Sequence, residues 1–64
     1  RDRESALELL NFLLADLGRK FVQSPSVLRQ KRIEVVMETL DLIKRNVNVN
    51  LAIDGMLLKL LSTD

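Results

Sequence analysis

Apolar residues recur every three or four positions along nearly the whole chain, and this spacing predicts α-helices rather than strands. Two short polar stretches, at residues 23–26 and 46–48, interrupt the pattern. We therefore expect an all-α fold, a three-helix antiparallel bundle with helices over about 5–21, 25–45 and 49–61. Short loops favour this arrangement because they place consecutive helices side by side.

The 64 residues are enough for one domain only, so residues 1–64 are interpreted as a single helical domain. A chain of this size buries only about 60% of its unfolded surface. Small folds without disulfides or metals usually depend on oligomerisation or on very good helix packing. Because the sequence also begins at Arg1 rather than at a methionine, we expect a fragment of a larger protein.

The composition offers little material for catalysis. There is no cysteine and no histidine, which removes thiol nucleophiles, thiolate metal sites and the usual general base. No glycine-rich phosphate loop is present. Glu34 and Glu38 are four residues apart and Asp41 lies on the same polar side of the second helix, but a solvent-facing surface explains them better than a metal site. We expect no enzyme activity, no metal and no cofactor.

The net charge of +1 gives no strong attraction to nucleic acid or to acidic membranes. No apolar stretch approaches the ~20 residues needed to span a bilayer. Arg29, Lys31 and Arg32 cluster near the start of the second helix and suggest an alternative function, a small helical DNA-binding regulator. The cluster has no aromatic partners and has acidic neighbours, so a solvated face is the preferred interpretation.

Capping residues locate the starts of the helices. Asp2 or Ser5 can cap the first helix. Ser24 is expected to be the N-cap of the second helix, with Pro25 at its first position. Asn48 is expected to cap the third helix, its side chain accepting from a backbone N–H near Leu51.

The first helix carries a broad apolar face. Leucines recur with helical spacing along it, and further apolar side chains widen the face well beyond a narrow seam. The central stripe is Leu7, Leu10, Leu14, Leu17 and Phe21, and the residues that widen it are Leu9, Phe12 and Leu13.

The third helix is apolar over more of its circumference than a domain this small usually covers. Either it is a central helix between the other two, or part of its apolar face meets another subunit. The centre of its apolar arc, around Ile53, Leu57 and Leu60, should pack against the other two helices. One flank or the other is left without an obvious cover, and such a patch tends to mark an interface. We expect self-association or binding to another subunit there; the candidate interface residues are either Leu51 and Leu58 on one line or Met56 and Leu61 on the other flank, and the handedness of the bundle decides between them.

Gly55 interrupts this helix, where glycine costs about 1 kcal/mol relative to alanine. It indicates either the close approach of another helix backbone or simple tolerance in a well-packed helix. Simple tolerance is slightly favoured.

The stretch from Asn46 to Leu60 resembles the C-terminal end of the delta-prime subunit of bacterial DNA polymerase III. That family often ends in a valine-asparagine pair, a short spacer, a leucine and a leucine-rich helix. The matching residues here are Val47, Asn48, Leu51, Leu57, Leu58 and Leu60. The resemblance covers about Ile33 to Leu61 and is thin over the first helix; Val49 stands where the family often has proline.

This resemblance implies a cytoplasmic, non-catalytic collar domain of a replicative clamp loader, which packs beside its counterparts in a five-membered ring. It implies other clamp-loader subunits as partners and no direct contact with nucleic acid, membrane or small molecule. The related gamma/tau subunit has a similar collar domain and remains an alternative. The family's nucleotide-binding-like module, zinc cysteines and arginine finger lie N-terminal to the matching region, and none occurs in these residues.

Overall fold

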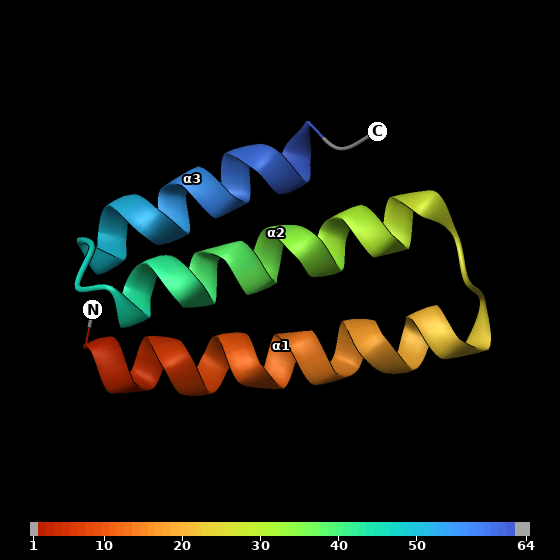
Figure 1. Cartoon of the computed structure of the whole chain (residues 1–64), viewed down its shortest axis with the longest axis horizontal. Helices are drawn as coiled ribbons and strands as arrows, with labels where there is room; N and C mark the ends of the chain where they lie inside the picture. Colours follow the sequence, from red (N-terminus) through yellow and green to blue (C-terminus); the bar gives the residue numbers. More distant parts are fainter. Residues whose placement is uncertain (1, 63–64) are drawn as a thin grey trace.

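The computed structural model describes residues 2–62, which form three α-helices and no strand. The helices are α1 (Arg3–Gln23), α2 (Val27–Lys44) and α3 (Val49–Leu61). Helix α2 lies between the other two and runs antiparallel to both, so α1 and α3 point the same way (Figure 1). The molecule measures 33 × 21 × 16 Å. The prediction of an all-α three-helix bundle is confirmed.

The central helix is α2, not α3. It packs closely against α1 and α3, whereas α1 and α3 scarcely meet. The expectation that the first two helices would both cover the third is therefore wrong. The physical reason is that α3 folds back from its short turn along α2, while α1 packs on the other side of α2 (Figure 1).

Helix α1 begins at Arg3 because Asp2, one of the two expected caps, accepts a hydrogen bond from the backbone N–H of Ser5 at 3.4 Å. The negative side chain of Glu4 in the first turn suits the positive end of the helix dipole. Helical structure continues through Gly18 to Gln23, beyond the expected end.

The start of α2 corrects one prediction. Its N-cap is Ser26, whose hydroxyl accepts a hydrogen bond from the backbone N–H of Arg29 at 3.1 Å. Ser24 instead closes α1, where its backbone N–H donates to the carbonyl of Lys20 at 2.9 Å. Both serines flank Pro25 and have the same capping chemistry. The long side chain of Arg29 also donates to the Lys20 carbonyl, at 2.7 Å. This contact joins residues nine positions apart across the turn, so the capping pattern that favoured Ser24 does not include it.

The turn from α2 to α3 is held by asparagines. Asn46 adopts a left-handed backbone conformation, with φ 67°, which asparagine tolerates better than most residues. The N–H of Val47 donates to the Leu42 carbonyl and that of Asn46 to the Ile43 carbonyl, the paired bonds of a Schellman motif. Asn48 then caps α3: its side-chain oxygen accepts from the Leu51 N–H at 3.1 Å.

The core lies where α2 meets its two neighbours. Its largest fully buried side chains are Leu10, Val36 and Ile43. They are joined by smaller or less deeply buried apolar residues: Ala6, Leu40, Ala52, Ile53 and Met56. Thr39 is the buried polar residue, and its hydroxyl donates to the Val35 carbonyl at 2.9 Å, so its polar group has a partner.

Replacing Asn48 with alanine should destabilise the fold by about 0.5–2 kcal/mol, because the first turn of α3 loses the acceptor for the Leu51 N–H. Asn48→Asp should be far milder, since the carboxylate keeps the acceptor and suits the helix dipole. Thermal unfolding of the three proteins measures this. Equal damage from alanine and aspartate would contradict the capping role.

Candidate interaction surface

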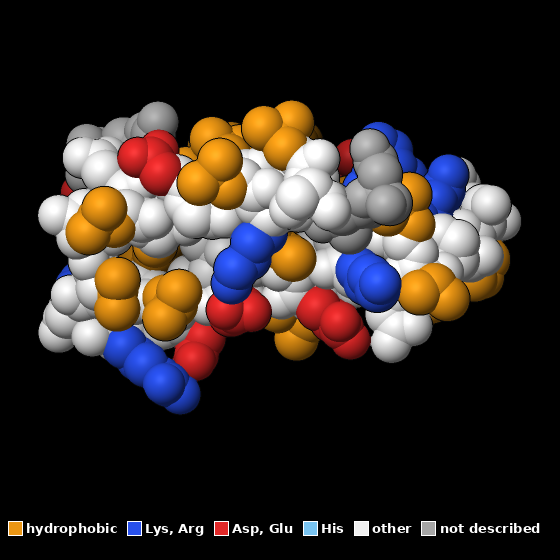
Figure 2. Space-filling view, turned by 90° about the horizontal axis from the view of Figure 1, so that it is seen from above, with side chains coloured by type: hydrophobic (Ala, Val, Ile, Leu, Met, Phe, Trp, Pro, Cys, Tyr) orange, Lys and Arg blue, Asp and Glu red, His pale blue; other side chains and the backbone are white. Residues whose placement is uncertain are grey.

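The outward side of α3 carries leucines that face solvent. Leu51, Leu58 and Leu61 are 69%, 68% and 78% exposed. Leu51 and Leu58 are seven residues apart and lie on one line of the helix, on the side opposite the buried Ile53 and Met56. Figure 2, which looks down on the α3 side of the molecule, shows apolar side chains at the surface among the charged ones. Three of the four candidate interface residues are therefore accessible.

Met56 is the exception, and its assignment as an interface residue is wrong. It is only 5% exposed and belongs to the core with Ala52 and Ile53. Ala52 and Ile53 each lie about one helical turn before Met56, so all three belong to the same face of α3. The reason is that the buried face of α3 is fixed by the position of α2, which places Met56 inward.

Leu57 is more exposed than the sequence predicts, the opposite of Met56. It was expected at the covered centre of the apolar arc but is 46% exposed. Since α1 does not pack along α3, an apolar groove of about 700 Å³ remains between these two helices. Residues of both helices line it: Asp2, Ser5, Ala6, Leu9, Leu10, Phe12, Leu13, Ile53, Met56 and Leu57.

Exposed apolar side chains form the walls of this groove. On α1, Leu9 and Phe12 are 62% and 72% exposed. The buried Leu10 and Met56 form part of its floor. The widened apolar face of the first helix is the sequence signal for these side chains. The groove itself depends on the separation of α1 from α3, which local sequence does not determine.

Charge at the far end of this face of α1 is largely compensated. Asp16, one turn beyond Phe12, forms ion pairs with Lys20 at 3.1 Å and with Arg19 at 3.4 Å. The hydrogen bond and positive charge of Lys20, with a smaller contribution from Arg19, hold the pKa of the Asp16 carboxyl below its usual value.

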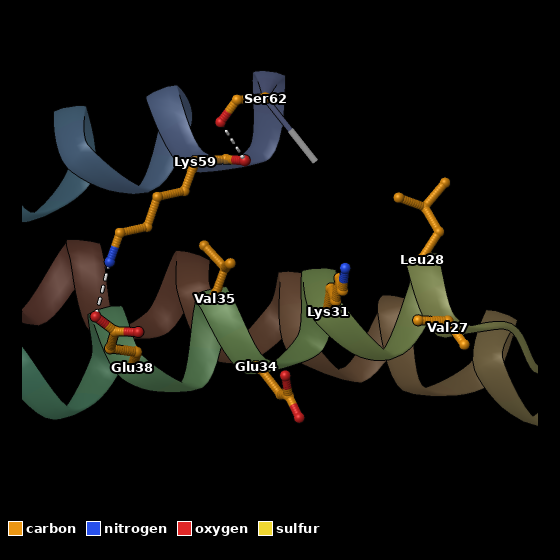
Figure 3. A pocket seen from close by; sticks show the side chains of 8 residues that line it. All are labelled: Val27, Leu28, Lys31, Glu34, Val35, Glu38, Lys59 and Ser62. Carbon is orange, nitrogen blue, oxygen red and sulfur yellow. Dashed lines mark hydrogen bonds and ion pairs between the residues drawn. The ribbon is translucent and has the colours of Figure 1, made fainter. Parts of the chain in front are cut away.

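A second, more polar hollow lies between the first half of α2 and the end of α3 (Figure 3). Lys59 of α3 reaches across it and pairs with Glu38 of α2, with 2.7 Å between Nζ and Oε1. Both side chains are more than half exposed, so the pair contributes little to stability. Glu38 is thus engaged with a lysine, and no group of three metal-ligating side chains is found in residues 2–62.

The basic residues of α2 do not make one patch. The Arg29 guanidinium is used in the turn, where it bonds the Lys20 carbonyl. Lys31 lines the second hollow with Glu34 (Figure 3). Arg32 is half-buried, one turn after Arg29 and on the same face. Two of the three side chains are therefore placed elsewhere, Arg29 in the turn and Lys31 beside Glu34.

Gly55 lies on the outward side of α3, one turn after Leu51 and one turn before Leu58. A Cβ added there would meet nothing within 4 Å, and the same holds for Gly18 in α1. The chain itself therefore does not require glycine at either position.

Comparison of the chain with protein-family models, curated proteins and solved structures finds no match. None of the three described helices has the length and apolar character needed to cross a bilayer.

Alanine at Gly18 and at Gly55 should each stabilise the folded chain by about 0.5–1 kcal/mol, because both positions are helical and open and alanine favours helix. Urea unfolding of the two variants measures the gain. Destabilisation by either alanine would show that the position is more confined than the structure indicates.

Truncation of a side chain to alanine should affect stability differently on the buried and the exposed side of α3. Met56→Ala should destabilise by about 2–5 kcal/mol, since it opens a cavity in the core. Leu58→Ala should change stability by no more than about 0.5 kcal/mol, since the side chain already faces water. Urea unfolding at low protein concentration tests this, and similar losses at both positions would contradict the assigned orientation of α3.

Proposed function

We propose that this chain is a non-catalytic subunit-assembly domain of a replicative DNA polymerase clamp loader, like the C-terminal collar domain of the delta-prime subunit. The observation that carries the proposal is the row of exposed leucines on α3. Leu51, Leu58 and Leu61 face solvent and have no cover within the described chain. Each leucine buried by a partner would contribute about 1.5–3 kcal/mol toward association.

The sequence resemblance supplies the identity of the partners. Its matching residues, Asn46 to Leu60, coincide with the turn that sets the position of α3 and with nearly all of α3. The same stretch therefore carries both the resemblance and the exposed leucines. In this proposal the partners are the other clamp-loader subunits, the location is the cytoplasm, and the chain makes no contact with DNA itself.

An association experiment with the gamma/tau subunit of a bacterial clamp loader tests the proposal. The chain should co-sediment with this subunit, and Leu58→Glu should abolish the complex because it places a charge in the apolar contact. Helical circular dichroism should be retained in Leu58→Glu, because the residue is 68% exposed. Met37→Glu is the matched control: Met37 is also exposed and mid-helix, on α2, and its variant should bind normally.

Two outcomes would overturn the proposal. One is the absence of any complex with gamma/tau, alone or together with further clamp-loader subunits. The other is binding of duplex DNA whose affinity falls steeply with salt concentration, which would favour the DNA-binding regulator instead.

A further inference from the structure

The groove between α1 and α3 is shaped for a helix. Its two walls belong to helices that run in the same direction and do not pack on each other along their length (Figure 1). The lining residues of α1 extend from Asp2 to Leu13, a rise of about 17 Å, which matches about three turns of helix. Leu9, Phe12 and Leu57 on its walls provide apolar contacts on both sides of such an occupant.

Charge distinguishes among the possible occupants. Asp2 lines the groove, Glu8 lies one turn before Phe12, and Asp54 lies one turn before Leu57. All three are exposed, and none forms an ion pair in the part of the chain that the structure describes. The lining residues include no lysine or arginine.

The cations of α1 do not offset this negative border. Arg3 is exposed and is not among the residues that line the groove. Arg19 and Lys20 are paired with Asp16, beyond the end of the groove. The groove is therefore apolar in its interior and acidic at its border.

We infer that this groove binds an amphipathic helix of another polypeptide that carries lysine or arginine residues on both sides of an apolar stripe. The inference rests on the proposed assembly function and adds the chemistry of one partner segment. Apolar side chains of the helix fill the space between Phe12 and Leu57. Its cations meet the exposed Glu8 and Asp54, which lie one turn from these two residues. The basic flanks give specificity, because like charges placed together oppose binding.

A second copy of the chain is a poor occupant for the same reason. Pairing of two copies groove to groove, in either direction, would place the acidic border of one copy against that of the other. Nucleic acid and anionic membranes are disfavoured as well, since both present negative charge. A basic helix is the occupant that satisfies both the apolar walls and their charged border.

Two synthetic peptides of about 18 residues, five helical turns, test the inference. They share one leucine stripe and differ only in their flanks, which are lysine in one and glutamate in the other. The 64-residue chain should bind the lysine peptide at least about tenfold more tightly by calorimetry, with an affinity that falls as salt is added.

Variants then locate the binding. Phe12→Ser should weaken binding of the lysine peptide at least about tenfold, and the Glu8→Lys, Asp54→Lys double variant should reverse the preference between the peptides. These side chains are exposed, so the variants should keep their helical circular dichroism. Val22→Ser is the matched control: Val22 is 79% exposed on α1 but does not line the groove, and its variant should bind as the unchanged chain does.

Equal affinity for the two peptides, binding of neither, or an unaffected Phe12→Ser variant would overturn the inference. So would a dimer of the chain alone, seen by sedimentation, that Phe12→Ser dissociates. If gamma/tau binds through Leu58 while neither peptide occupies the groove, the inference fails and the proposed function stands. If the lysine peptide binds as expected and no clamp-loader subunit does, the proposed function fails and the groove assignment stands.

Discussion

Burial of α2 between two helices that scarcely touch each other is the packing on which the whole structure depends. Val36 and Ile43 of α2 are completely buried, and burial of an aliphatic side chain of this kind stabilises a fold by about 1.5–3 kcal/mol. A chain of 64 residues has few such positions. Because α1 and α3 offer each other so little contact, each is held almost entirely by its own interface with α2.

The two turns fix the directions of the helices and therefore decide which residues of each helix face solvent. Between α2 and α3, the left-handed Asn46 and the cap at Asn48 follow each other so closely that α3 must fold back along α2. At the opposite end, Arg29 bonds the last turn of α1 through the Lys20 carbonyl. The direction in which α3 leaves its turn decides that Met56 points to the core and Leu58 to solvent.

The exposure of apolar side chains on α1 and α3 follows from the separation of these two helices. In a closed three-helix bundle, α1 would cover the flank of α3 that carries Leu57. Here the same flank forms one wall of a groove whose other wall includes Phe12. Leu57 and Leu58 are neighbours in sequence but lie about 100° apart around the helix. One short helix therefore presents two separate apolar surfaces, the groove wall and the outward row, and these surfaces are the physical basis of the proposed assembly function.

The sequence by itself determined the features that depend on contacts within a few residues. Helical spacing predicted three helices, and the amide chemistry of Asn48 predicted the start of α3, because periodicity and capping act within one or two turns. It wrongly favoured Ser24 over Ser26 as the cap of α2, because Pro25 suits a first helical position, whereas Ser24 in fact closes α1. It also could not decide that Met56 is buried while Leu57 is half exposed. That choice depends on which side of α3 meets α2 and on the distance of α1 from α3, and only the tertiary packing of residues distant in sequence sets these.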